Sequence, residues 1–101
     1  MTGASDVAPL EPGTRLVASR DAVSADLEGE TVILSMKDGV YYGIEKVGSL
    51  IWRELATPTT LGAVHARIVA TYAVAPERAW TDLVAVARDL IASGLAERAP
   101  D

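Results

Sequence analysis

Cysteine and phenylalanine are both missing from this chain of 101 residues, and histidine occurs once, as His65. Without cysteine the chain forms neither disulfides nor thiolate metal sites. A metal centre needs several clustered ligands, and a lone histidine does not supply them. Nucleophilic catalysis needs a Ser, Cys or Thr beside a positioned base, and the sequence offers no such combination. We therefore expect a protein that is not an enzyme and carries no metal or cofactor.

Positive charge is also sparse. Lys and Arg number 9 against 14 Asp and Glu, so the formal net charge is −5. Binding to a nucleic-acid backbone requires clustered basic residues, whereas those of this chain are scattered. A winged-helix DNA-binding regulator remains an alternative, because residues 60–72 and 76–93 fit a helix-turn-helix. However, Glu77, Asp82 and Asp89 on the second of these helices would repel DNA, and we favour a different partner.

Long apolar runs are the third absence. No window approaches the ~18 consecutive apolar residues of a membrane span. The first residues have no charged start followed by an apolar run, which a signal peptide requires. These features predict a cytoplasmic protein without a membrane partner. Residues 1–14 are rich in Gly, Ala, Pro and Ser and predict a flexible tail, which leaves residues 15–98 as a single domain.

The first half of the domain has the period-2 pattern of strands. Apolar and polar residues alternate over residues 23–27, and residues 31–36 are β-branched and apolar. The Asp-Gly pair that follows is a strong hairpin signal, so residues 40–44 should return as a third strand. Residues 15–21 fit either a short strand or an extended lead-in. The pattern predicts a three-stranded antiparallel meander.

The second half has the period of 3.6 that is typical of helices. Residues 47–55 fit a short helix, and residues 60–72 fit a second one, capped by Thr59 or Thr60. Residues 76–93 fit a third, with a proline in its first turn. Strands followed by helices predict an α+β fold with a winged helix-turn-helix-like arrangement.

Four segments, residues 29–34, 38–45, 48–52 and 90–95, resemble the PqqD-like family in order and composition. They have the sequences GETVIL, DGVYYGIE, GSLIW and LIASGL. This family supplies the recognition domains (RiPP recognition elements) of pathways that make ribosomally synthesised, post-translationally modified peptides. The chain is most similar to the stand-alone members in lasso-peptide biosynthesis. The relative that acts as a chaperone of the pyrroloquinoline quinone precursor peptide is less similar and remains an alternative.

The resemblance implies a function for the third strand. Such domains bind the leader segment of a precursor peptide, which adds as a further strand to the third strand and packs against the third helix. They then present the precursor to a leader peptidase of the transglutaminase-like type and to a cyclase. The physical basis is β-augmentation, in which an unpaired sheet edge offers its N–H and C=O groups to another chain.

The third strand, residues 40–45, and the third helix supply the candidate site. Alternation along the strand should place Tyr42 and Ile44 on one face and Tyr41 and Gly43 on the other. Ile44 is expected to belong to the core, and Gly43 to leave room for a second backbone. Periodicity does not settle which part of the third helix faces the groove. The candidate peptide-binding residues are Val40, Tyr41, Tyr42, Gly43, Ile44, Glu45, Arg78, Asp82, Leu83, Val86, Ala87 and Leu90.

Overall fold

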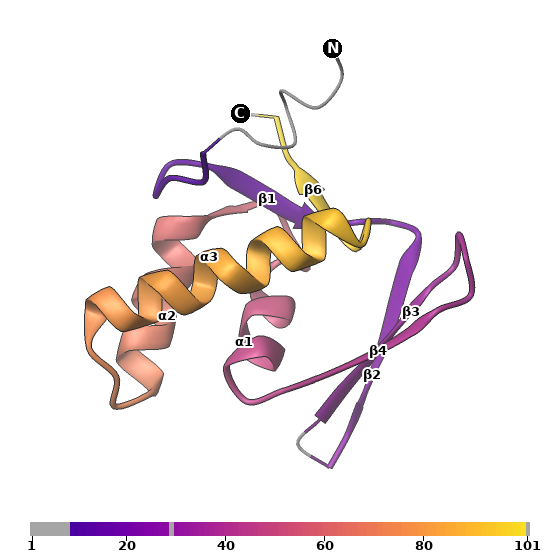
Figure 1. Ribbon diagram of the computed structural model, residues 1–101, viewed down its shortest axis with the longest axis horizontal. Coiled ribbons are helices and arrows are strands. Elements are labelled where there is room, and N and C mark those ends of the chain that lie inside the picture. Colours follow the sequence, from indigo (N-terminus) through magenta and orange to yellow (C-terminus); the bar gives the residue numbers. More distant parts are fainter. Residues whose placement is uncertain (1–8, 29, 101) are drawn as a thin grey trace.

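A meander of three strands followed by three helices forms the body of the chain, in the order that the apolar spacing predicts (Figure 1). The computed structural model describes residues 9–28 and 30–100. It confirms the α+β fold and adds a second, smaller sheet that the sequence did not predict. The elements are, in chain order, β1 (Arg15–Ala18), β2 (Ala22–Leu27), β3 (Glu30–Ser35), β4 (Tyr41–Glu45), α1 (Val47–Glu54), β5 (Thr59–Thr60), α2 (Leu61–Thr71), α3 (Pro76–Ala92) and β6 (Ala96–Arg98).

The main sheet is antiparallel and has the order β2-β3-β4. Ile33 in the central strand lies opposite Ser24 on one side and Tyr42 on the other. The hairpin from β3 to β4 contains Gly39, whose φ of 71° lies in the left-handed region that favours glycine. The predicted meander is therefore confirmed. Because β3 is central, β2 and β4 each keep one edge that pairs with no strand of the described residues.

The smaller sheet has the order β5-β1-β6 and joins segments that lie far apart in the sequence. Leu16 of β1 lies opposite Thr59 on one side and Arg98 on the other. The segment 15–21, for which the sequence allowed two conformations, therefore begins as a strand. Its neighbours β5 and β6 contain 2 and 3 residues. Such short strands cannot show a period of two, which is why the sequence did not reveal them.

Residues 9–14, which the sequence assigns to a tail, lie against the start of α2. Leu10 is buried there, and the Gly62 N–H donates to the Pro12 C=O at 2.8 Å. Residues 1–8 of the expected tail lie outside the described residues. The division into a tail and a domain stays a prediction.

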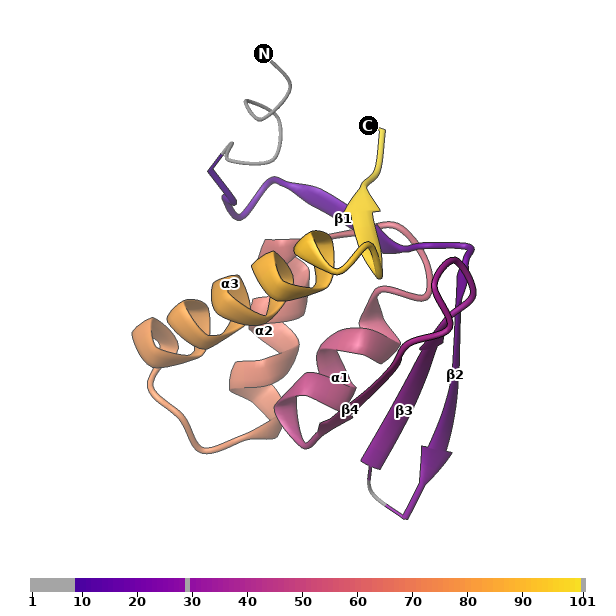
Figure 2. The same ribbon diagram turned by 45° about the vertical axis from the view of Figure 1, so that its right-hand side comes forward.

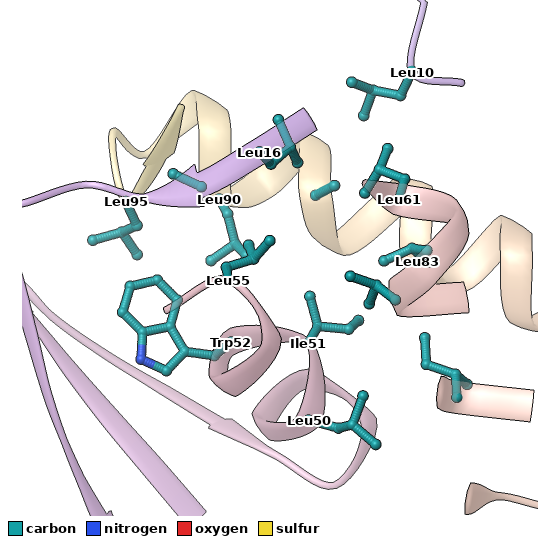
Figure 3. Packing of buried hydrophobic residues seen from close by; sticks show 14 of the residues in the cluster. Leu10, Leu16, Leu50, Ile51, Trp52, Leu55, Leu61, Leu83, Leu90 and Leu95 are labelled. Carbon is teal, nitrogen blue, oxygen red and sulfur yellow. The ribbon is translucent and has the colours of Figure 1, made fainter. Parts of the chain in front are cut away.

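The core is centred on α1, which lies between the main sheet and the two longer helices (Figures 1 and 2). Ile51 and Leu55 are fully buried in it. Trp52 lies on the side of the core nearest the strands (Figure 3), and its indole Nε1–H donates to Ser24 Oγ at 2.9 Å. The buried apolar side chains are Leu10, Leu16, Ile33, Leu50, Ile51, Trp52, Leu55, Leu61, Val64, Ile68, Ala79, Leu83, Ala87, Leu90, Leu95 and Ala96.

Polar contacts attach the inner side of β4 to α1. Ser49 Oγ donates to the Ile44 C=O at 3.3 Å, and the Thr31 hydroxyl lies 3.0 Å from Ser49 Oγ. Thr31 and Ser49 are both buried, and each hydroxyl also has a hydrogen-bond acceptor of its own, Asp26 Oδ1 for Thr31 and the Ile44 C=O for Ser49. Lys46, between β4 and α1, has a φ of 56°, which is strained for a residue other than glycine. These contacts hold one side of β4 firmly and leave its other edge exposed.

The start of α2 offers a test of this local structure. Thr60 Oγ1 accepts a hydrogen bond from the Ala63 N–H at 3.2 Å, which confirms the predicted threonine cap. Thr60→Ala should lower the free energy of unfolding by about 1 kcal/mol. For a domain of this size the melting temperature should then fall by about 4–8 °C. Thr60→Ser keeps the oxygen and should melt within about 2 °C of the parent chain, and equal melting of all three proteins would contradict the cap.

Candidate peptide-binding site

The outer edge of β4 has backbone N–H and C=O groups that pair with no strand of the described residues. The Ser35 N–H donates to the Val40 C=O at 3.0 Å, so this pair is hydrogen-bonded across the hairpin. Bonded and non-bonded pairs alternate along antiparallel strands. The residues of β4 at even positions therefore direct their backbone groups toward β3. Tyr41, Gly43 and Glu45 direct their N–H and C=O groups away from the sheet, where no strand of the described residues lies.

The side chains of β4 alternate in the same way. Tyr42 and Ile44 are half-buried and pack against the core, whereas Tyr41, Gly43 and Glu45 are exposed on the outer face. The predicted division of the strand into two faces is therefore confirmed. A strand added to β4 would also alternate, so every second side chain of it would lie on the inner face, toward α3.

An apolar groove of about 420 Å³ lies on this inner face, between β4 and the C-terminal half of α3. Ile33 is fully buried and Leu90 is only 5% exposed, so the groove reaches the core. The apolar lining suits an aliphatic or aromatic side chain of a ligand, because burying one releases water from both surfaces. The groove is lined by Ile33, Tyr41, Tyr42, Gly43, Ile44, Val86, Asp89, Leu90, Ser93 and Leu95.

The charges at the site are mostly negative. Asp89 is the only charged residue that lines the groove within the described residues, and its exposed carboxylate forms no ion pair there. On the outer face, Glu30 and Glu45 lie directly opposite each other on neighbouring strands. A Glu30 carboxylate oxygen lies 3.1 Å from the position that a Cβ at Gly43 would take. An incoming peptide therefore meets carboxylates on both sides of the β4 edge.

The structure brings only part of the predicted residues together. Six of the predicted residues line the groove, namely Tyr41, Tyr42, Gly43, Ile44, Val86 and Leu90. The other two strand residues, Val40 and Glu45, are exposed at the two ends of the β4 edge.

The remaining candidates lie on α3 but not in the groove. Leu83 and Ala87 are 0% exposed and belong to the core, so a peptide cannot touch them while the core stays packed. Arg78 and Asp82 lie one turn apart and form an ion pair, with 3.4 Å between Arg78 Nε and Asp82 Oδ2. Both lie in the N-terminal half of α3, and neither lines the groove.

Four residues of the groove lining were not among the candidates, namely Ile33, Asp89, Ser93 and Leu95. Asp89 and Ser93 follow Val86 at spacings of three and seven, which places them on the same helix face. This spacing was present in the sequence, but Asp89 and Ser93 are polar and therefore do not belong to the apolar stripe from which the candidates on the helix were chosen. Leu95 follows the helix, and only the fold places it beside β4.

The single histidine contacts the start of α3 from α2. His65 Nε2 donates to the Pro76 C=O at 2.8 Å, and its ring contacts the Trp80 ring edge-on with 5.6 Å between centroids. It thereby links α2 to the start of α3. Across residues 9–28 and 30–100, no three metal-ligating side chains gather at one point. In the same part of the chain, no helix has the length and hydropathy needed to cross a membrane.

A free strand edge beside an apolar groove is the geometry of a domain that binds an extended peptide by strand addition. The family described as coenzyme PQQ synthesis protein D (PqqD) matches residues 30–96, and the chain belongs to this family. The resemblance inferred from the sequence is thus confirmed. Domains of this type bind peptides and are not catalytic, in agreement with the prediction that the chain is not an enzyme.

Two solved structures are similar to the chain. TbiB1 in complex with the TbiA(beta) leader peptide has 32% sequence identity and a TM-score of 0.76, and the match covers 84% of this chain and 99% of that one. A lasso peptide synthetase B1 complexed with the leader peptide has 21% identity and a TM-score of 0.72, and the match covers 81% of this chain and 96% of that one. The second likeness supports the fold alone. A comparison with curated proteins gave no match.

Proposed function

We propose that the chain binds the leader segment of a ribosomally synthesised precursor peptide as an added strand on β4, in lasso-peptide biosynthesis. The observation that carries this proposal is the free edge of Tyr41, Gly43 and Glu45 beside the apolar groove. Membership of the PqqD family and the likeness to TbiB1, which was solved with a leader peptide, support it.

The edge and the groove contribute differently to binding. Backbone hydrogen bonds form with any extended sequence, and each contributes about 0.5–1.5 kcal/mol. Burying one large apolar side chain contributes about 1.5–3 kcal/mol. A change of 1.4 kcal/mol corresponds to about a tenfold change in affinity. A ligand with an apolar side chain in the groove should therefore bind roughly 10-fold to 100-fold more tightly than one with a polar side chain at that position. The edge thus supplies general affinity, and the groove supplies selectivity.

The chemical steps then belong to partner enzymes. We place a transglutaminase-like leader peptidase first and a cyclase second, both acting on a precursor held by this domain in the cytoplasm. The alternative, a chaperone of the pyrroloquinoline quinone precursor peptide, would use the same edge. The two differ in which precursor peptide is bound more tightly.

Titration of a fluorescently labelled leader peptide into the purified chain tests the proposal. The cognate leader should bind saturably, with a dissociation constant in the micromolar range or below. A scrambled leader keeps composition and charge but loses the spacing of its apolar residues, so it should bind at least about tenfold more weakly. A pyrroloquinoline quinone precursor peptide is the third ligand. Equal binding of cognate and scrambled leaders, or tighter binding of the third peptide, would contradict the proposal.

A further inference from the structure

The main sheet has a second free edge, on β2. The Met36 N–H donates to the Asp21 C=O at 2.6 Å, so odd-numbered residues of β2 direct their backbone groups toward β3. Ala22, Ser24 and Asp26 direct theirs away from the sheet. The Ala22 N–H already donates to the Ser19 C=O at 3.1 Å. The N–H and C=O groups of Ser24 and Asp26 remain available at this edge, and no strand of the described residues pairs there.

A groove larger than that at β4 lies beside this edge, with a volume of about 690 Å³. It runs between β2, the connection from β1 and the C-terminal end of α1. The Trp52 ring contributes to its floor, and the bond from its Nε1–H to Ser24 Oγ fixes the ring against β2. The groove is lined by Ala18, Ser19, Arg20, Ala22, Ser24, Ala25, Asp26, Trp52, Arg53 and Ala56.

Two arginines set the electrostatic character of the groove. Arg20 and Arg53 are exposed, and neither forms an ion pair or a side-chain hydrogen bond within the described residues. The carboxylate in the groove, that of Asp26, already accepts a hydrogen bond from Thr31 Oγ1 at 2.9 Å. In a chain with a net charge of −5, two guanidinium groups without carboxylate partners stand out at one groove.

We propose that the β2 edge is a second docking site, which takes an extended, acidic segment of a partner protein. An extended segment fits because the edge offers backbone groups at strand spacing. An acidic one fits because guanidinium groups bind carboxylates through paired, charge-assisted hydrogen bonds. The site lies on the opposite edge of the sheet from β4, and the proposal does not depend on leader binding.

The test uses three blocked heptapeptides that differ only in charge, with the sequence Thr-X-Val-X-Val-X-Thr and X as Glu, Gln or Lys. Each is titrated into the full ¹⁵N-labelled chain and followed by amide chemical shifts. The Glu peptide should shift the amides of β2 saturably, and the Gln peptide should bind about 3-fold to 10-fold more weakly. In the double variant Arg20→Glu/Arg53→Glu the order should reverse, with the Lys peptide binding best.

The reversal is decisive because a nonspecific loss of structure would weaken all three peptides alike. The leader titration in the same double variant serves as a fold control and should be unchanged. Equal binding of the three peptides, shifts confined to β4, no shifts at millimolar peptide, or dimerisation of the chain through β2 would each overturn the proposal. A failed leader titration with an intact charge reversal would count against the leader proposal alone.

Discussion

Gly43→Pro should weaken leader binding by at least about 30-fold, or ~2 kcal/mol, while the fold stays intact. The Gly43 N–H points away from the sheet, so proline removes no hydrogen bond to β3. Its ring instead occupies the place where the carbonyl of an added strand would lie. Fluorescence anisotropy with labelled leader measures the affinity, and thermal unfolding checks the fold.

Gly43→Ala is the matched control. The added Cβ would meet Glu30 Oε2 at 3.1 Å, the far end of a flexible side chain that can move aside. The outward N–H is kept, so the leader should bind within about twofold of the parent chain. That Gly43 makes room for a second backbone stays a prediction from the sequence, and the structure gives it no support, since a side chain at this position would lie over the outer face, beside Glu30, rather than at the strand edge. Equal binding by the proline and alanine variants would rule out strand addition at this position.

Val86→Asp should weaken leader binding by at least about tenfold. Val86 is half-buried and lines the groove of β4, so the change removes apolar contact with the ligand. It also places a second carboxylate beside Asp89, in a groove that an apolar side chain must fill. Calorimetric titration with the leader measures the effect.

Val84→Asp makes the same change two residues earlier on α3. Val84 is also half-buried and packs against the core, but it does not line the groove. Both variants should lose stability, and only Val86→Asp should lose affinity at a temperature where both are folded. If aspartate unfolds either chain, the near-isosteric pair Val86→Thr and Val84→Thr keeps the comparison. Parallel losses of affinity at the two positions would show that the groove is not the contact surface.

Much of the fold was predictable because its signals are local. The Asp-Gly turn, the period of two before it and the period of 3.6 after it each lie within a few residues. The sheet β5-β1-β6 was not predictable, since its pairings join Leu16 to Thr59 and to Arg98. Strands this short have no pattern of their own, and they form only after the helices bring the segments together.

The residues that line the groove were predictable along β4 and less so along α3. On a strand, alternation alone separates the two faces, and Tyr42 and Ile44 lie where it places them. On a helix, the apolar stripe is wider than the groove. Leu83 and Ala87 therefore satisfied the same pattern as Val86, although they face the core. Which of these three residues lines the groove depends on where β4 lies, and the sequence of the helix does not specify that position.

The outward backbone groups at Tyr41, Gly43 and Glu45 have a consequence for how a leader evolves. A peptide paired with them presents its residues alternately to the groove and to solvent, and a shift by one residue exchanges the two sets. Deletion of one leader residue between two groove-filling positions therefore turns the second of them toward solvent, whereas deletion of two residues keeps both in the groove. We expect the number of residues between such positions to stay even or stay odd among related leaders, even where the residues themselves differ.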